Sequence, residues 1–334
     1  MNNLKSMLYG NNILFLAPDF FDYYKLIAAR MESYGASVDI ILESFSNTSL
    51  LYRYFFIKSE KAKFKYTHDY YTKKINELNK SYNYILVIRG EALDELILKT
   101  LRNKFPTAKF IMYQWDSVKN NPNAKKISRY FDKCLTFDQR DANTYKWEYR
   151  PLFYTNEGKK TQKNRNIDFI LVGTLYYQRA LLYKAIKQFC ENNNYYFYDY
   201  LYVRKLEFIV HKFLLKDKRY SILTNKDVKF TPLKTPDLNR LYEESRVFVD
   251  YAADDQSGLT MRTIESVGNR CKIITNNKAI LKSDIYNPSN VFIYDINDFS
   301  IDPEFVNAPY ENLDNEIYIK YSLDGWLKDI FHGE

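Results

Sequence analysis

The stretch SRVFVDYAADDQSGLTMRTIESVGNRCKIITNN, residues 245–277, indicates the fold because an amphipathic segment separates two short apolar segments. The apolar segments at 247–252 and 271–277 contain Val, Phe and Ile and are typical of buried strands. The segment LTMRTIESV at 259–267 carries its apolar side chains at helical spacing. A strand, a helix and a strand in this order predict a parallel α/β sheet.

The same alternation of strands and helices occurs in both halves of the chain. In the first half it comprises the apolar run at 13–17, a helical pattern at 21–35 and the strand SVDIILES at 37–44. In the second half, the strand IDFILVG at 167–173 precedes the helical segment 178–193. The fold class is therefore α/β, with two Rossmann-like domains. Ligands of such sheets bind at the carboxyl ends of the strands, so we expect the domains to face each other across a cleft that holds the site.

A polar, aperiodic segment at 155–166 predicts a linker between the two domains. We expect an N-terminal domain over 1–154 and a C-terminal domain over 167–315. Residues 316–334 are predicted to form an amphipathic helix that packs back on the N-terminal domain. The apolar side of this helix would hold Trp326, Leu327, Ile330 and Phe331.

The composition of the 334 residues limits the classes of partner and compartment. The formal net charge of +8 favours anionic partners such as nucleotides, phospholipid head groups or nucleic acid. No nucleic-acid-binding motif occurs and the aromatic residues lie mostly at core spacing, so we expect no nucleic-acid partner. The three cysteines and three histidines are scattered, which argues against a disulfide framework and a histidine metal site and favours a reducing compartment.

Neither a signal peptide nor a transmembrane helix is expected from the sequence. The N-terminal MNNLKSMLYGNN lacks a long apolar core, and no run of about 18 apolar residues occurs. We therefore expect a cytoplasmic protein that is at most peripheral on the inner face of the membrane.

Gly173 and Thr174 end the first strand of the C-terminal half and are candidates for phosphate binding. A glycine between a strand and a helix lets the backbone approach a phosphate, and the following helix offers free amides. Arg179 lies near the start of that helix, although a tight turn with a surface arginine would give the same pattern. No G-x-G-x-x-G pattern occurs, so we expect no dinucleotide cofactor.

A second candidate site follows the strand at 247–252. Unpaired amides at the start of the predicted helix favour an anion, and they belong to Ser257, Gly258, Leu259 and Thr260. Arg262 can add a charge-assisted bond to a diphosphate. Glu265, three residues further on, can accept bonds from both hydroxyls of a ribose. The alternative is an ordinary amphipathic helix with an Arg262–Glu265 ion pair at its surface.

These segments resemble the bacterial GT-B glycosyltransferases, and more narrowly the capsule, lipopolysaccharide and CgeB-like enzymes. The C-terminal segments that carry the resemblance are DFILVGTLYYQR at 168–179 and the stretch 245–277. The N-terminal segments are FIMYQWDS at 110–117, FDKCLTFDQRDA at 131–142 and PLFY at 151–154. The resemblance implies a nucleotide-sugar donor bound by the C-terminal domain and a glycan or lipid-linked acceptor bound by the N-terminal domain.

The resemblance also implies roles for single residues. Glu265 matches the ribose-binding glutamate, and Gly173 with Thr174 match the turn that faces the diphosphate. Many retaining members carry a second glutamate eight positions earlier, where this chain has Ser257. Both a retaining and an inverting mechanism therefore stay open. GT-B enzymes generally stabilise the leaving diphosphate with amides and basic residues, so no metal is expected, even at Asp254-Asp255.

An inverting transferase needs a base that takes the proton of the acceptor hydroxyl. Asp19, Glu91 and Asp116 each follow a predicted strand of the N-terminal half, at the end where ligands bind. Asp116 is favoured because the neighbouring Trp115 can stack on a sugar face of the acceptor. A helix-capping or turn role for Asp116 is the alternative.

Residues 201–220 predict an amphipathic helix with a basic face. Apolar side chains recur there at helical spacing and are surrounded by Arg204, Lys205, Lys212, Lys216, Lys218 and Arg219. Helices of this kind bind anionic membrane surfaces, which would suit a lipid-linked acceptor. A helix packed in the core with a solvated basic face is the alternative.

Together these features predict a glycosyltransferase that moves a sugar from a nucleotide-sugar donor to a surface polysaccharide or a lipid-linked glycan. The nucleotide sugar is a substrate, and no cofactor is expected. The missing second glutamate motivates an alternative, which is a non-catalytic GT-B-like subunit that binds a nucleotide sugar or a partner enzyme in glycan assembly.

Overall fold

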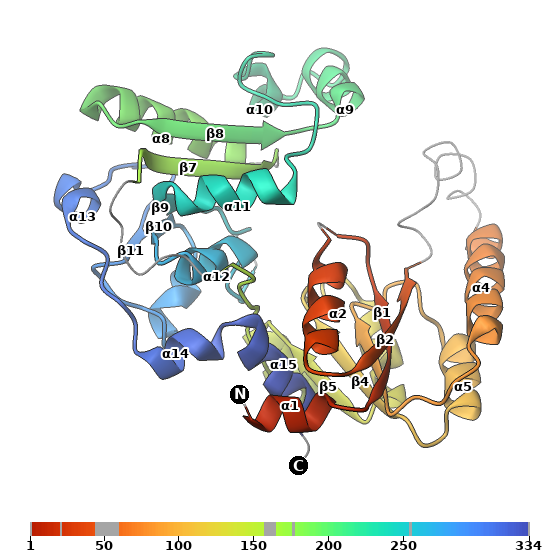
Figure 1. Cartoon of the computed structure of the whole chain (residues 1–334). Coiled ribbons are helices and arrows are strands. Elements are labelled where there is room, and N and C mark those ends of the chain that lie inside the picture. Colours follow the sequence, from red (N-terminus) through yellow and green to blue (C-terminus); the bar gives the residue numbers. More distant parts are fainter. Residues whose placement is uncertain are drawn as a thin grey trace. The chain divides into compact units, whose positions relative to one another are not determined.

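The structure is a computed structural model in which the chain forms two compact units (Figure 1). One unit comprises Met1–Pro151 and Leu323–Glu334, and the other comprises Leu152–Ser322. The structure describes residues 2–20, 22–43, 60–156, 165–175, 178–253 and 256–332. Most of the expected linker, together with Asp254 and Asp255, lies outside the described residues.

The first unit is built on a six-stranded parallel sheet with the strand order β2-β1-β3-β4-β5-β6. Its strands are β1 (Asn12–Ala17), β2 (Ser37–Leu42), β3 (Tyr84–Ile88), β4 (Lys109–Gln114), β5 (Lys133–Thr136) and β6 (Glu148–Tyr149). The inner strands β1, β3 and β4 are almost wholly buried, so they read as continuous apolar runs. The helices are α1 (Asn2–Leu8), α2 (Tyr23–Ser33), α4 (Glu60–Glu77), α5 (Glu95–Lys104), α6 (Asn123–Ile127), η1 (Ser128–Tyr130), α7 (Gln139–Tyr145) and α15 (Leu323–Phe331).

The second unit is built on a five-stranded parallel sheet with the strand order β11-β10-β9-β7-β8. Its strands are β7 (Ile167–Thr174), β8 (Phe197–Tyr202), β9 (Ser245–Val249), β10 (Lys272–Thr275) and β11 (Val291–Ile293). Its helices are α8 (Arg179–Asn193), α9 (Lys205–Ile209), η2 (Val210–Leu214), α10 (Lys218–Ser221), α11 (Thr235–Glu243), α12 (Met261–Gly268), η3 (Lys278–Lys282), α13 (Pro303–Asn307) and α14 (Asn315–Lys320). Two parallel sheets with helices confirm the predicted α/β class.

Three elements differ from the expectation based on sequence. β8 lies at the edge of its sheet and is only half-buried over most of its length, so its tyrosines do not form an apolar run. The segment 201–220 is not one helix, because β8 runs to Tyr202 and α9 is followed by the π-helix η2. The segment 316–334 is split into α14 and α15, because the Tyr321 carbonyl accepts a hydrogen bond from the Tyr154 amide at 2.9 Å and leaves the helical path.

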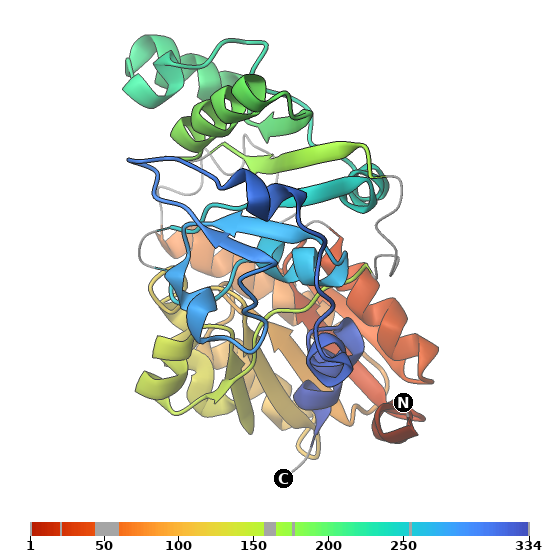
Figure 2. The ribbon, with the colours of Figure 1, turned by 90° about the vertical axis from the view of Figure 1, so that its left-hand side faces the viewer.

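The C-terminal helix α15 belongs to the first unit and completes its core. It lies beside α1 in both views (Figures 1 and 2). Trp326 and Leu327 are fully buried, and the Trp326 ring packs edge-on against Tyr113 of β4 with a centroid distance of 4.9 Å. Asp329 pairs with the buried Arg150 at 2.7 Å. Both apolar packing and an ion pair therefore hold α15 in place.

Replacing Trp326 by Ala should lower the free energy of unfolding of the first unit by about 3–5 kcal/mol, because a large buried ring is lost and a cavity remains. The measurement is urea unfolding followed by the fluorescence of Trp115 and Trp147, which both lie in this unit. Leu96→Ala, at a half-exposed position of α5, is the control. A loss of less than about 1 kcal/mol for Trp326→Ala, as expected of the control, would contradict this role of α15.

Candidate functional site

Gly173 lies near the carboxyl end of β7, where two arginine side chains approach it from different helices. A side-chain carbon at this position would lie 2.7 Å from Arg179 Nη1 and 3.0 Å from Arg262 Nη2. β7 continues through Thr174, so Gly173 is inside the strand and not in the turn that the sequence predicts. The absence of a side chain at Gly173 therefore makes room for two guanidinium groups.

Both arginines are fixed by hydrogen bonds to the strand that they approach. Arg179 is the first residue of α8, and its Nη1 donates to the Thr174 carbonyl at 2.5 Å. Arg262 is the second residue of α12, and its Nη2 donates to the Val172 carbonyl. Both side chains are largely buried. Two positive charges therefore lie close together at the end of β7.

Asp250 supplies a negative charge to this pair of arginines. It directly follows β9, is fully buried, and its Oδ1 lies 3.5 Å from Arg262 Nη1. Its Oδ2 accepts hydrogen bonds from the hydroxyls of Thr275, at 2.9 Å, and Thr263, at 3.4 Å. Arg262 therefore forms its ion pair with Asp250. The alternative of an ordinary surface helix predicts an ion pair between Arg262 and Glu265 instead. Sequence reasoning misses Asp250, although an acid at the end of the apolar run VFV is a signal for it.

α12 begins at Met261, two residues later than the sequence predicts. Its N-cap is Thr260, whose hydroxyl accepts a hydrogen bond from the Thr263 amide at 3.1 Å. This capping bond fixes the start of the helix and leaves the buried Leu259 in the preceding loop. The leading amides of the helix are those of Met261 and Arg262. Arg262 therefore places both an amide and a guanidinium group at this end of the helix.

Ser257 and Gly258 lie in the loop before α12 and not in its first turn. The Gly258 carbonyl accepts hydrogen bonds from Asn277 Nδ2 and Gln256 Nε2, both at 3.0 Å, which fix the loop. Ser257 Oγ is buried and has no hydrogen-bond partner within the described residues. Ser257 thus has a polar group to offer to a ligand, whereas the carbonyl of Gly258 is already bonded.

Glu265 is a buried carboxylate on α12. Thr155 Oγ1 donates to its Oε1 at 3.4 Å. Burial raises the pKa of the Tyr242 hydroxyl, while Arg262 lowers it and Glu265 raises it further. Glu265 therefore lies on the same helix as Arg262, three residues further on, and both charges act on Tyr242.

In the first unit, three acids gather around Arg89 at the carboxyl ends of β2, β3 and β4. Arg89 Nη2 lies 2.7 Å from Glu91 Oε2, and Arg89 Nε lies 3.1 Å from Asp116 Oδ2. Glu43, the residue after β2, is buried and accepts a hydrogen bond from the Glu91 amide at 3.0 Å. The structure brings the predicted Glu91 and Asp116 together. The structure also places Glu43 and Arg89 in this group. In the sequence, only their positions at strand ends indicate that they could belong to a site.

Burial changes the acid strength of two of these carboxyl groups. It raises the pKa of Glu43 to about 7, against the opposing charge of Arg89. Burial also raises the pKa of Asp116. The positive charge of Arg89 lowers this pKa, and the negative charge of Glu91 raises it further. Asp116 does not cap the following helix, because the N-cap of α6 is Pro122. A carboxyl group with a pKa near neutrality is suited to accept and release a proton.

No contact links Asp19 to these acids among the described residues, whereas Trp115 lies in an aromatic group. Asp19 is exposed and makes no ion pair with the residues that the structure describes. The Trp115 ring packs against Phe20 and Tyr23, with centroid distances of 6.0 and 6.4 Å. About half of Phe20 is exposed, so these rings form an aromatic surface beside Asp116.

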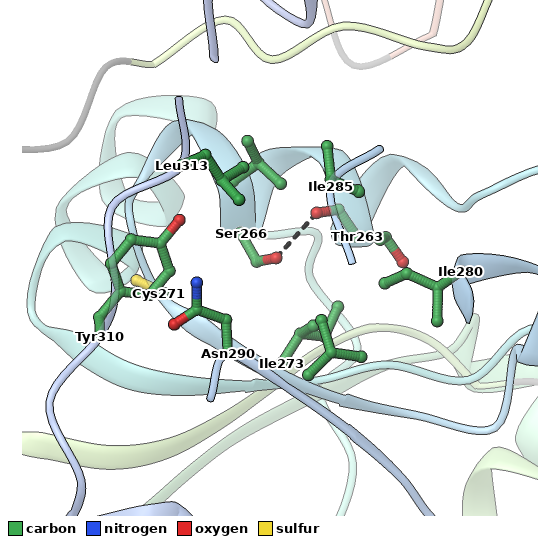
Figure 3. Close-up of a pocket in the computed structure, with 11 residues that line it drawn as sticks. Thr263, Ser266, Cys271, Ile273, Ile280, Ile285, Asn290, Tyr310 and Leu313 are labelled. Atoms are coloured by element: carbon green, nitrogen blue, oxygen red, sulfur yellow. Dashed lines mark hydrogen bonds between the residues drawn. The ribbon is translucent and has the colours of Figure 1, made fainter. Parts of the chain in front are cut away.

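A small pocket in the second unit lies between α12, β10 and the chain near Tyr310 (Figure 3). Its walls are mainly apolar, and Ser266 Oγ donates to the Thr263 carbonyl at 2.7 Å within it. None of the predicted donor-binding residues line this pocket. It has room for about one water molecule and none for a nucleotide, so it is not a candidate donor site.

Two kinds of feature are absent from the part of the chain that the structure describes. No group of three or more His, Cys, Asp or Glu side chains there is arranged to hold a metal ion. No helix among the described residues is long and apolar enough to cross a bilayer.

Known structures share this architecture over nearly the whole chain. Sucrose-phosphate synthase from Thermosynechococcus elongatus is similar with a TM-score of 0.52 and 11% identity, over 96% of this chain and 94% of the other. The chain has the GT-B fold. A structure described as a UDP-N-acetylglucosamine 2-epimerase from Listeria monocytogenes is similar with a TM-score of 0.52 and 9% identity, over 95% and 94% of the two chains. No protein-family model and no curated protein matches the sequence.

The raised pKa of Glu43 makes the stability of the first GT-B unit depend on pH. Native Glu43 keeps its proton up to a pKa of about 7, whereas the unfolded chain releases it at its ordinary pKa of 4.5. Raising the pH between these values therefore favours unfolding, by about 1.4 kcal/mol per pH unit. Glu43→Gln should remove this contribution, so the variant should gain stability over the wild type as the pH rises.

Urea unfolding followed by tryptophan fluorescence at a series of pH values measures this difference. The exposed Glu32→Gln in α2 is the control and should keep the pH dependence of the wild type. Identical pH dependence in the wild type and in Glu43→Gln would show that Glu43 does not titrate with a raised pKa.

Proposed function

We propose that this protein is a glycosyltransferase that moves a sugar from a nucleoside-diphosphate-sugar donor to a hydroxyl of a surface polysaccharide or a lipid-linked glycan. The observation that carries the proposal is the convergence of Arg179 and Arg262 on Gly173, at the end of the sheet where parallel α/β units bind ligands. The GT-B fold supports it. One similar structure is named a sucrose-phosphate synthase, and the other is named for the nucleotide sugar UDP-N-acetylglucosamine.

The charges at Gly173 favour a diphosphate. Arg179 and Arg262 bring two like charges to the same position in the strand, where they repel each other. Asp250 lies within ion-pair distance of Arg262, with 3.5 Å between Oδ1 and Nη1. A guanidinium group fits two phosphate oxygens, and the start of α12 adds amides and the positive end of the helix dipole. A bound diphosphate would relieve the repulsion between the arginines.

Glu265 would bind the ribose of the donor. A ribose presents two neighbouring hydroxyl donors, and an ionised carboxylate has acceptor sites for both. Because Glu265 is buried, its bonds to a ligand would be stronger than bonds made in water. The buried Ser257 Oγ would add a further hydrogen bond to the donor.

The first unit would bind the acceptor. The rings of Phe20, Tyr23 and Trp115 offer a surface on which the apolar face of a sugar can pack. Asp116, next to Trp115, would take the proton of the attacking hydroxyl, a role favoured by its raised pKa. As the acceptor oxygen bonds to the anomeric carbon, the bond to the diphosphate breaks and negative charge grows on the leaving oxygen. The arginine pair would stabilise that charge, so the proposal assigns no step to a metal.

Calorimetric titration with nucleoside diphosphates tests the donor site. At least one of UDP, GDP, ADP and CDP should bind the wild type. Arg179→Ala and Glu265→Gln should each weaken that ligand about ten- to hundredfold, because each removes a hydrogen bond to a charged group. The exposed Arg240→Ala and Glu304→Gln are the matched controls and should bind as the wild type does. Wild-type affinity in both site variants would remove these residues from the donor site.

Release of nucleoside diphosphate in the presence of glycan or lipid-linked acceptors tests transfer itself. Release should require the acceptor and should continue in EDTA, because arginines and amides would carry the charge of the leaving group. Conversion of the free nucleotide sugar without any release would identify an epimerase instead. Binding of a donor with no turnover in any acceptor extract would leave a binding function only.

A further inference from the structure

A helical segment comprising α9, η2 and α10 connects β8 to α11 (Figure 1). This segment carries many exposed apolar side chains. Within the described residues, eighteen large hydrophobic side chains are exposed, and six of them lie in this one segment. The six form the apolar surface of the segment and are Leu206 (74% exposed), Ile209 (40%), Phe213 (62%), Leu214 (73%), Leu215 (63%) and Ile222 (39%).

The inner side of the same segment is packed, so the exposed side chains are not those of an unpacked segment. Phe208 and Tyr220 are buried, and their ring centroids lie 6.0 Å apart. His211 stacks on Tyr220 with a centroid distance of 4.7 Å, and Lys212 donates to the Leu223 carbonyl. The segment thus has a buried face and a separate apolar exposed face. This arrangement differs from the alternative of a core-packed helix whose outer face is only basic.

Part of the apolar surface follows the spacing of neighbours on a helix. Leu206, Ile209 and Phe213 are separated by three and four residues, which is the spacing of neighbours on a helix surface. Leu214 and Leu215 follow Phe213 directly, at the end of η2. Several exposed apolar side chains within one short segment are unfavourable in water and mark a surface that contacts an apolar medium or partner.

Basic side chains border the apolar surface. Arg204 and Lys205 precede it, Lys216 follows Leu215, and all three basic side chains are exposed. Glu207 is the one acidic residue in the sequence from 203 to 216. A second copy of this chain would bring two positive borders together, which disfavours self-association. Anionic lipid head groups complement the border, and the acyl boundary beneath them accommodates leucine and phenylalanine.

We propose that the apolar surface and its basic border attach the protein to an anionic phospholipid bilayer. The apolar side chains enter the boundary between head groups and acyl chains, while Arg204, Lys205 and Lys216 contact lipid phosphates. The inference rests on this surface alone and is independent of the proposed function.

Vesicle co-sedimentation of the full chain tests the attachment. Phosphatidylcholine vesicles that contain about 30% phosphatidylglycerol should retain the wild type, whereas pure phosphatidylcholine and high salt should reduce retention strongly. Leu206→Ser/Leu214→Ser should lower the partition coefficient by about tenfold or more, because two of the most exposed apolar side chains are lost. The matched control is Leu181→Ser/Leu281→Ser, with both leucines 46% exposed outside the surface, and it should bind as the wild type does.

Three results would overturn the attachment. The first is that the wild type does not co-sediment with anionic vesicles. The second is that Leu206→Ser/Leu214→Ser binds these vesicles as strongly as the wild type. The third is a wild-type dimer in analytical ultracentrifugation that this double variant converts to a monomer, because the apolar surface would then be a protein interface. An unchanged melting temperature and nucleoside-diphosphate affinity in the double variant would show that a loss of vesicle binding arises at this surface and not at the donor site.

Discussion

The approach of two arginine side chains to Gly173 constrains the arrangement of the second unit. Each guanidinium group needs the space that a side chain on Gly173 would fill, and each is held by a carbonyl of β7. Arg179 comes from the start of α8 and Arg262 from the start of α12, so two helices are tied to one strand. Arg262 pairs with Asp250 after β9, and Thr275 of β10 donates to the same carboxylate. Three neighbouring strands and two helix starts therefore meet at one charged centre.

The carboxyl ends of the two sheets gather different charged groups. In the second unit, two guanidinium groups converge on Gly173, and that of Arg262 pairs with the buried Asp250. In the first unit, Glu43, Glu91 and Asp116 gather around Arg89, which leaves an acidic site. Transfer from an anionic donor to a hydroxyl needs one group that stabilises a leaving diphosphate and one that accepts a proton. Under the proposed function, the arginine pair would serve the first need and the acids around Arg89 the second.

The sequence predicts which residues lie at the ends of strands. It does not predict which other side chains these residues contact. Gly173, Arg179 and Glu265 stand out because each lies close to an apolar run in the sequence. The position of Asp250 at the end of the run VFV is visible in the sequence, but its partners Arg262 and Thr275 come from other elements and are not. Glu43 reads as the end of a strand, and its raised pKa depends on burial that only tertiary packing creates. β8 is missed for a related reason, because a half-buried edge strand lacks the continuous apolar run of a central strand.

Calorimetric titration of Gly173→Ala with the nucleoside diphosphate that binds the wild type tests the diphosphate site most directly. The added methyl group removes no polar group, but it takes the space of the two guanidinium groups. Because those groups are the far ends of long side chains, they can move aside while the unit stays folded. We predict that the affinity falls by about tenfold or more in a variant that stays folded. A folded Gly173→Ala variant that binds the nucleoside diphosphate as tightly as the wild type would contradict a diphosphate site at the arginine pair.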